Sequence, residues 1–387
     1  MDDETLERLL RLRGEFPVAE RCAYLNHAAI GAMPRRSAER MAALATTVSE
    51  TGDRHWPERN AEAERVRGLA ARLIGARHDH EVAFTENTST ALSMIAEGLD
   101  WRPGDNVVGV TGEFPSNVYP WMQLEARGVE YRRIAERDYR IDLGELTAAI
   151  DGRTRVVALS WVQFASGFRS DLARVGAVCR ERGALFVVDV IQGLGALDLA
   201  PYVESGESGL VDVAAGASHK WLLGPEGLAL LYVSDRVVER LRPDRAGWRS
   251  MRNLFDWTEL AIDWNEGAKR FESGTLNVYG IAALGGSLEI LLEAGPKAIE
   301  ERVLALADRA AQGLAGRGFQ VLSSRRPGET SGIVMATHPR HTADALVEHL
   351  AQRGVAAAAR AGRLRVAPHF YNTEEEIDRL LDELKGL

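Results

Sequence analysis

One lysine stands in a setting that would make its amine a nucleophile. Lys220 follows an apolar, strand-like run and precedes the turn at 224–227, which reads Gly-Pro-Glu-Gly, and apolar residues flank it closely. A lysine in a desolvated pocket has a lowered pKa, and its neutral amine can attack a carbonyl carbon. The alternative is an ordinary surface lysine, and Lys220 alone does not decide between the two.

A carboxylate occupies a comparable position. Asp189 ends the apolar run at 185–188, where a carboxylate is costly unless it meets a cation, although an aspartate that caps a turn is the common alternative. Because Asp189 and Lys220 end neighbouring predicted strands, we expect both to face one crevice. Together they suit a protonated pyridine ring that carries an aldehyde, which describes pyridoxal 5′-phosphate (PLP).

A site for a phosphate group is also available. Residues 84–93 are typical of a strand end, a hydroxyl-rich turn and the start of a helix. Free backbone N–H groups at the helix N-terminus, with the hydroxyls of Thr88 and Ser89, form an anion site. By itself this pattern is an ordinary helix cap, but beside Lys220 and Asp189 it predicts where the phosphate binds.

The elements that must position these residues alternate along the middle of the chain. The pattern predicts strands at 106–110, 155–159, 184–190, 210–215 and 228–233, with a helix over 170–182. Such alternation favours a mostly parallel sheet with helices on both faces. Farther along, the pattern predicts one long helix over 287–314, strands at 318–322, 331–335 and 364–366, and a helix over 342–353. A last helix opens with Thr373 as N-cap and Glu376 closing a capping box, which completes a smaller α+β domain.

Composition narrows the function classes. The chain has 387 residues, 45% of them hydrophobic, and a formal net charge of −9, which favours a soluble two-domain protein over a nucleic-acid binder. Its two cysteines, Cys22 and Cys179, form no disulfide framework or metal knuckle, so we expect a cytoplasmic location and no metal. No signal peptide and no apolar stretch of about 20 residues is present, so we expect no membrane association.

At this point the motifs resemble those of a known family. The sequence is similar to the class V aminotransferase family of fold-type I PLP-dependent enzymes, which includes cysteine desulfurases, selenocysteine lyases, isopenicillin N epimerase-like proteins and kynureninases. Asp-x-x-Gln at 189–192 and His-Lys-x-x-x-Gly-Pro at 219–225 carry the resemblance most specifically. It implies an α/β fold in which a large domain, 18–285, holds a mostly parallel seven-stranded sheet. Residues 1–17 and 286–387 would form the smaller domain.

The resemblance also implies which residues hold the cofactor. Lys220 would be the Schiff-base lysine, and Asp189 would hold the protonated pyridine nitrogen. The remaining cofactor contacts would come from residues that touch the ring hydroxyl (Gln192), the phosphate (Thr88, Ser89 and His219) and the ring face (Phe114). One departure is visible, because Ala217 stands where relatives place a phosphate-binding serine, and Ser218 is the next residue.

Further residues would bind substrate or a second subunit. Arg365 matches the arginine that clamps the α-carboxylate of an amino-acid substrate, a task that suits its planar guanidinium. Asn26 and His27 lie in a loop that approaches the substrate in relatives. Thr275 matches a residue that reaches the phosphate of the partner subunit, which implies a homodimer with shared active sites.

The reaction follows less directly from the sequence. Desulfurases carry a nucleophilic cysteine on a C-terminal loop shortly before the equivalent of Arg365, whereas residues 354–363 here contain none. We therefore expect β-elimination of the C–S lyase type on a small or sulfur-containing L-amino acid rather than a persulfide mechanism. Transamination to an oxo acid is the alternative, then epimerisation with His27 as a conceivable second base. A PLP-binding protein without turnover is the last alternative, and the retained Arg365 argues against it.

Overall fold

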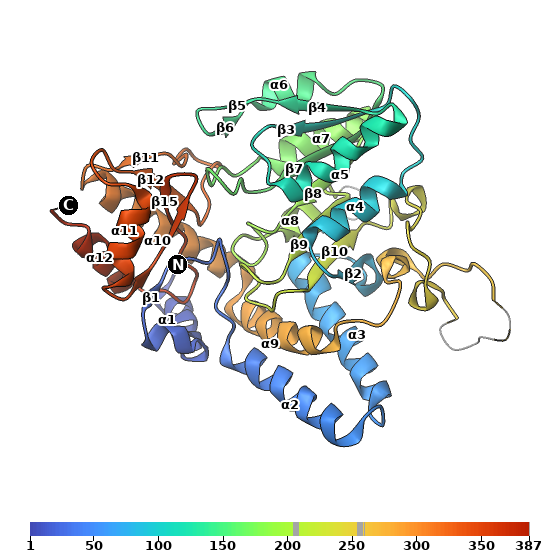
Figure 1. Ribbon diagram of the computed structural model, residues 1–387, viewed down its shortest axis with the longest axis horizontal. Helices are drawn as coiled ribbons and strands as arrows, with labels where there is room; N and C mark the ends of the chain where they lie inside the picture. Colours follow the sequence, from blue (N-terminus) through green and yellow to red (C-terminus); the bar gives the residue numbers. More distant parts are fainter. Residues whose placement is uncertain (204–208, 254–257, 259, 387) are drawn as a thin grey trace.

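The computed structural model describes residues 1–203, 209–253, 258 and 260–386, and its largest element is a seven-stranded sheet (Figure 1). The strand order is β2-β10-β9-β8-β7-β3-β4, and β10 alone runs antiparallel to its neighbours in this sheet. In that order the strands are β2 (Val82–Thr85), β10 (Ala229–Val233), β9 (Val213–Ala217), β8 (Leu185–Asp189), β7 (Thr154–Ser160), β3 (Asn106–Val110) and β4 (Glu130–Ile134). The predicted mostly parallel sheet of seven strands is confirmed.

Helices cover both faces of this sheet, which explains why its strands are apolar runs rather than alternating ones. Val108 and Val157 belong to the hydrophobic cluster on the face that α3, α7 and α9 cover. Val107 and Val156 belong to the cluster on the opposite face, under α4 and α5. The helices of this domain are α2 (Arg35–Thr51), α3 (Trp56–Ile74), α4 (Thr88–Gly98), α5 (Tyr119–Met122), α6 (Leu143–Ala148), α7 (Leu172–Arg182), α8 (Ala200–Val203) and α9 (Val278–Ala294).

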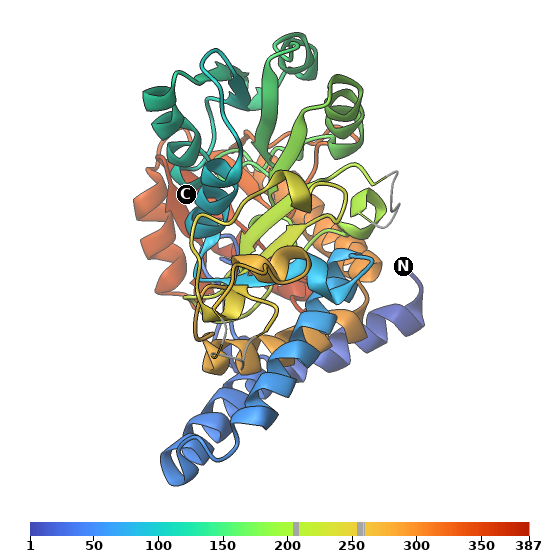
Figure 2. The ribbon, with the colours of Figure 1, turned by 90° about the vertical axis from the view of Figure 1, so that its right-hand side faces the viewer.

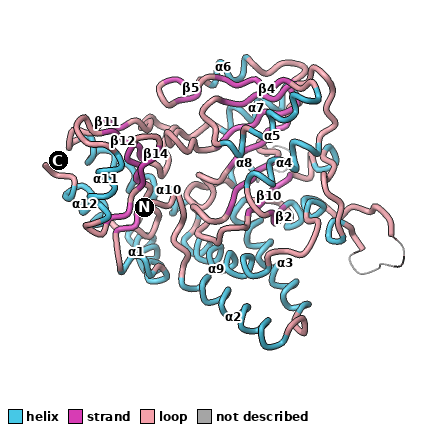
Figure 3. Tube along the Cα trace, in the orientation of Figure 1, coloured by secondary structure: helices cyan, strands magenta, loops and turns pink. Residues whose placement is uncertain are grey.

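A second, smaller sheet lies beside the large one, and Figure 3 shows its strands next to helices of their own. It consists of β11 (Gln320–Val321), β12 (Val334–Thr337), β15 (Arg363–Val366) and β14 (Ala358–Arg360), with α10 (Pro296–Ala315), α11 (Ala343–Ala351) and α12 (Glu374–Glu383). These elements share a separate hydrophobic core. The predicted capping box of the last helix is confirmed, because Thr373 and Glu376 each accept a hydrogen bond from the other's backbone N–H.

The prediction of one long helix over 287–314 is wrong. The chain forms α9 and α10 instead, which meet at an angle of 83°. Gly295 joins them with a φ of +84°, which a residue with a side chain rarely adopts, and Pro296 lacks the N–H that a continuing helix needs. The predicted domain boundary at 286 falls inside α9, which packs against α2 and α3. We therefore propose that the large domain ends at Gly295.

The N-terminal segment touches both domains. α1 (Asp3–Leu12) packs against α9 of the large domain, whereas the ring of Phe16 stacks on that of Tyr371 with centroids 3.8 Å apart. β1 (Ala23–Tyr24) then pairs in parallel with β13 (Val355–Ala356) of the small domain. The assignment of residues 1–17 to the small domain stays a prediction.

Two further differences from the sequence prediction concern the large domain. The strand expected at 210–215 begins later, at Val213, because the N–H groups of Leu210 and Val211 donate to the carbonyl of Tyr202 rather than to β8. The long helices α2 and α3 were not predicted, and both views show them extending beyond the rest of the molecule (Figures 1 and 2).

No single helix among the described residues is long and apolar enough to cross a membrane. The bent pair α9 and α10 passes that test together, by length and composition, although most residues of α9 are buried within the protein.

Candidate active site

Lys220 and Asp189 lie at the carboxyl ends of adjacent parallel strands, as the sequence predicts. Asp189 is the last residue of β8, where it pairs with Ala215 of β9, and Lys220 follows β9 after two residues. Because parallel strands end at the same edge of a sheet, both side chains lie at the edge where the crevice is expected.

The carboxylate of Asp189 is almost fully buried, at 2% exposure. Burial raises the pKa of Asp189, and the negative charge of Glu113 raises it further. The backbone N–H of Ile191, which donates to Oδ1 over 2.9 Å, has the opposite effect. Glu113 is itself buried and accepts hydrogen bonds from the backbone N–H and hydroxyl of Ser160 and from the amides of Gln163 and Asn117. A carboxylate in this position is well suited to a cationic partner such as a protonated pyridine nitrogen.

The surroundings of Lys220 favour the neutral form of its amine more than water does. Burial lowers its pKa, the charge of Asp189 opposes this effect, and the guanidinium groups of Arg365 and Arg360 add to it. Its Nζ lies 5.7 Å from the centroid of the Phe114 ring, which is the aromatic ring predicted to cover the cofactor. A lysine whose pKa is lowered in this way supplies the neutral amine that Schiff-base formation requires.

The turn that carries Lys220 is fixed by contacts on both sides. The hydroxyl of Ser218 is within hydrogen-bond distance of the carbonyls of Pro225 and Leu228, so this side chain faces the interior of the turn. On the other side, the N–H of Gly31 donates to the carbonyl of His219 over 2.7 Å. A Cβ at position 31 would lie 2.0 Å from the carbonyl oxygen of Lys220, so only glycine fits there.

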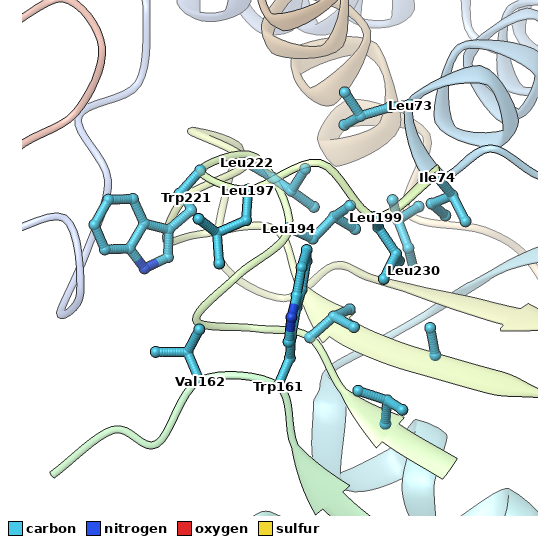
Figure 4. Close-up of a cluster of buried hydrophobic side chains, with 14 of the residues drawn as sticks. Leu73, Ile74, Trp161, Val162, Leu194, Leu197, Leu199, Trp221, Leu222 and Leu230 are labelled. Atoms are coloured by element: carbon cyan, nitrogen blue, oxygen red, sulfur yellow. The ribbon is translucent and has the colours of Figure 1, made fainter. Parts of the chain in front are cut away.

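Gln192 and Trp221 connect this turn to the hydrophobic core below it. The indole N–H of Trp221 donates to Oε1 of Gln192 over 2.9 Å, and Nε2 of Gln192 donates to the carbonyl of Ala28 over 3.0 Å. Figure 4 shows the indole of Trp221 beside Leu197 of the segment after β8, and both belong to the same hydrophobic cluster. One N–H of the Gln192 amide has no part in these bonds and remains available for a ring hydroxyl.

The predicted phosphate site lies at the N-terminus of α4. Asn87 caps this helix by accepting from the N–H of Thr90 over 2.8 Å, which leaves the N–H groups of Thr88 and Ser89 at the open end. The hydroxyl oxygen of Thr88 accepts from the N–H of Ala217, three residues before Lys220, so this helix end adjoins the lysine turn. The half-buried His219 follows in that turn, and the hydroxyl of exposed Ser89 donates to that of Ser116.

Arg365 is an unusual buried cation. It lies on β15 with 1% exposure, and neither Nε nor Nη2 has a hydrogen-bond partner among the described residues. Burial lowers its pKa to about 10, and the charge of Arg360 adds to the effect. A buried guanidinium without an anion is costly, so these two free donors call for a ligand that bears a carboxylate.

The two loop residues predicted to approach the substrate differ from each other. Asn26 forms an isolated parallel β-bridge with Ala367, two residues beyond Arg365. Its buried side-chain Oδ1 lacks a hydrogen-bond partner among the described residues. His27 is fully buried, with Nδ1 bonded to the carbonyl of Ala367 and Nε2 to the hydroxyl of Tyr371. Since both ring nitrogens of His27 are engaged within the protein, its geometry supports a structural role and not that of a second base.

Thr275 is not brought to Lys220 within this chain. It is exposed and lines two hollows, one with Trp248 and Tyr279 and a second with Thr85 and Glu86. Neither hollow is lined by Lys220. The loop that carries Thr275 follows the buried ion pair between Arg67 and Glu272, in which Nη1 and Oε1 are 2.7 Å apart.

Glu113 and Gly31 were missed from the sequence. Glu113 follows strand β3 by three residues, so the signal that selected Asp189, a carboxylate just past a buried strand, was also present there. The requirement for glycine at position 31 depends on a contact with a turn almost 190 positions away along the chain, and no local pattern marks it.

Replacing Asp189 with asparagine should lower the pKa of Lys220 further, because the carboxylate favours the protonated amine. The neutral amine would then predominate at lower pH. When PLP is added to the cofactor-free protein, the rate at which visible absorbance develops should increase with pH. The midpoint of this increase should lie at a lower pH in the variant. Asp100→Asn, at an exposed site, is the control and should leave this profile unchanged. An unshifted or upward-shifted midpoint in Asp189→Asn would contradict the assignment.

Comparisons with known proteins show the family of this chain. The family model for class V aminotransferases matches residues 23–380. A probable cysteine desulfurase of Methanothermobacter thermautotrophicus is 31% identical over 350 residues, 84% of each chain, and the uncharacterized aminotransferase YcbU of Bacillus subtilis is 29% identical over 330 residues, 85% of each chain.

Solved structures show the same fold. The apo cysteine desulfurase of Thermococcus onnurineus NA1 is 23% identical, with a TM-score of 0.85 over 96% of each chain. The cystine C–S lyase C-DES, solved with cysteine persulfide, is 24% identical, with a TM-score of 0.86 over 95% of this chain and 98% of the other. The family match over most of its length shows that this chain is a PLP-dependent enzyme of the class V aminotransferase family.

Proposed function

We propose that this enzyme catalyses β-elimination of the C–S lyase type on a small or sulfur-containing L-amino acid, without a persulfide on a cysteine. The observation that carries the proposal is the β14–β15 hairpin, which occupies the place where the resemblance puts the desulfurase cysteine loop. Its strands are joined by two residues, Ala361 and Gly362, with φ values of +50° and +72°. This tight turn holds no cysteine and leaves no length for a loop that reaches the substrate.

The two cysteines of the chain lie elsewhere. Cys179 is buried in α7, where burial raises the pKa of its thiol, and such a thiol is a poor nucleophile. Cys22 precedes β1, and burial together with the charge of Glu376 raises its pKa as well. Neither environment favours the thiolate that a persulfide mechanism needs.

The substrate-binding part of the proposal rests on Arg365. Its Nε and Nη2, which have no partner among the described residues, would donate to the α-carboxylate, and this would place the Cα–H of the amino acid in the crevice that Lys220 is expected to face. The positive charges of Arg360 and Arg365 around Lys220 also favour an anionic substrate.

PLP, when bound, supplies an electron sink for the pair released at the α-carbon. Asp189 would keep the ring nitrogen protonated, Thr88 and the N-terminus of α4 would hold the phosphate, and Phe114 would cover the ring. The amino group of the substrate would replace Lys220 on the cofactor, and the freed, neutral Lys220 Nζ would take the α-proton. The Cβ–S bond would then break so that sulfur leaves with its electron pair. The three-carbon remainder takes up water to give pyruvate and ammonia.

We also propose that two copies of the chain assemble with shared sites. The exposed Thr275 and the neighbouring Trp248, 38% exposed, belong to a surface separate from Lys220. A second copy seated there would receive Thr275 at its phosphate site, as the family resemblance implies.

Product analysis tests the proposed reaction. Holoenzyme incubated with L-cystine, L-cysteine and L-alanine should release equal amounts of pyruvate and ammonia from the sulfur substrates without an added oxo acid. The Cys22→Ala/Cys179→Ala variant should retain this activity. Pyridoxamine phosphate, with turnover that requires an oxo acid, would indicate transamination instead. Loss of turnover in the double variant, with one sulfur atom added to a cysteine of the unaltered enzyme, would indicate a desulfurase.

A further inference from the structure

A tyrosine at the tip of a small hairpin lies against the strand that carries Arg365. β5 (Glu136–Arg137) and β6 (Arg140–Ile141) pair antiparallel, and the two residues between them, Asp138 and Tyr139, have φ values of +49° and +61°. Turns of this type favour asparagine, aspartate or glycine, and a bulky aromatic residue with positive φ is rare. Such a conformation persists where surrounding contacts determine it, so the contacts of Tyr139 require an explanation.

The side chain of Tyr139 meets Arg363, the first residue of β15. The guanidinium carbon of Arg363 lies 4.5 Å from the centroid of the tyrosine ring, and its Nη2 donates to the tyrosine hydroxyl over 3.3 Å. The other terminal nitrogen, Nη1, donates to the carbonyl of Ala165 over 3.4 Å. The large domain therefore holds Arg363 through a cation–π contact and two hydrogen bonds.

Arg363 and Arg365 are two positions apart on one strand, so their side chains lie on the same face. In the β14–β15 hairpin, Arg363 pairs with Arg360 beside the turn, and Arg365 pairs with Ala358. Arg363 is thus the first residue of β15 and follows the two-residue turn directly. A contact that fixes this end limits how far Arg365 can shift along or across the sheet.

The β5–β6 hairpin contacts the small domain at a second point. Arg140 forms an ion pair with Glu329, in which Nε and Oε2 are 2.7 Å apart. Glu329 lies between β11 and β12 of the small sheet, and Figure 1 shows β5 and β6 on the side of the large domain that faces this sheet. The hairpin therefore contacts the small domain at two points, at β15 and at the segment between β11 and β12.

We propose that Tyr139 is a positioning residue for substrate binding, which acts through Arg363 to hold Arg365 in place for the α-carboxylate. The inference rests on the proposed function, because it requires Arg365 to bind that carboxylate. Tyr139 itself touches neither cofactor nor substrate in this arrangement.

The test compares two substitutions in the holoenzyme. Tyr139→Ala removes the ring and should raise the dissociation constant of L-alanine, read from the absorbance of bound PLP, by about three- to tenfold. The KM of L-cysteine should rise equally, while kcat and thermal stability change little. Tyr139→Phe keeps the ring against the guanidinium and should stay within about twofold of the unaltered enzyme.

Coupling to Arg363 separates this role from a general structural one. If Tyr139 acts through Arg363, the Tyr139→Ala/Arg363→Met variant should bind L-alanine no more weakly than Arg363→Met alone. Arg137→Ala is the matched control, because Arg137 lies on the same hairpin, is 68% exposed and pairs with Glu145. Its binding of L-alanine should be unchanged.

Three results would overturn the inference: unchanged binding in Tyr139→Ala, equal losses in Tyr139→Phe and Tyr139→Ala, or additive losses in the double variant. Arg365→Met distinguishes these from a failure of the proposed function. If that variant binds L-alanine normally, the assignment of Arg365 is wrong. If it loses binding while Tyr139→Ala does not, only the role of Tyr139 is wrong.

Discussion

Lys220→Ala should abolish turnover, with a fall in kcat of about 10³-fold or more, because it removes both the amine that would bind PLP and the base that would take the α-proton. The visible absorbance of the Schiff base should disappear as well. Lys220→Arg should fail in the same way, since a guanidinium keeps the charge but offers no neutral amine near neutral pH.

Peptide mapping makes this test decisive. The chain contains four lysines, at positions 220, 269, 297 and 385, so borohydride reduction followed by mass spectrometry assigns the modified residue without ambiguity. We expect the reduced cofactor on Lys220 alone. Lys297→Ala is the control, because this side chain is exposed on α10, and it should retain both colour and turnover. A coloured, active Lys220→Ala enzyme would refute the assignment.

Arg365→Met should have opposite effects on substrate binding and on stability. Loss of the guanidinium removes the partner of the α-carboxylate, which should raise KM by about 30- to 1000-fold, the range expected for a buried charge pair. The same change removes a buried charge whose Nε and Nη2 lack partners in the described structure, so the free protein should unfold at a higher temperature.

Steady-state kinetics and thermal unfolding without substrate check the two effects. Arg365→Lys serves as the comparison, because it keeps a buried charge but loses the planar pair of donors, so its KM should rise without a gain in stability. A lower unfolding temperature for Arg365→Met together with an unchanged KM would show that the guanidinium only supports the fold.

Local sequence patterns were sufficient for five strands of the large sheet and for the central pair of residues, but β4 was not among the predicted strands, and the number of seven strands came from the family resemblance. The buried strands that end at Asp189 and just before Lys220 are continuous apolar runs, and the topology of parallel sheets places their ends together. The break between α9 and α10 was missed, although Gly295-Pro296 is a signal that ends one helix and begins another.

Contacts between distant parts of the chain could not be predicted in this way. His27 is engaged by Tyr371, which is 344 positions away, so no spacing rule could have shown that both of its nitrogens are occupied. Likewise, only the packed structure shows that Nε and Nη2 of Arg365 have no hydrogen-bond partner among the described residues. Sequence patterns describe the elements, whereas the availability of a polar atom depends on packing between them.

The segment 26–31 hydrogen-bonds to both domains within six residues, to Ala367 beyond β15 and to the carbonyl of His219 beside Lys220. A rigid-body rotation of the small domain would have to break one of these bonds or drag the lysine turn with it. Substrates should therefore enter and leave through side-chain and loop movements at the crevice, and the distance between the carboxylate clamp and the reactive amine should stay nearly constant through each catalytic cycle.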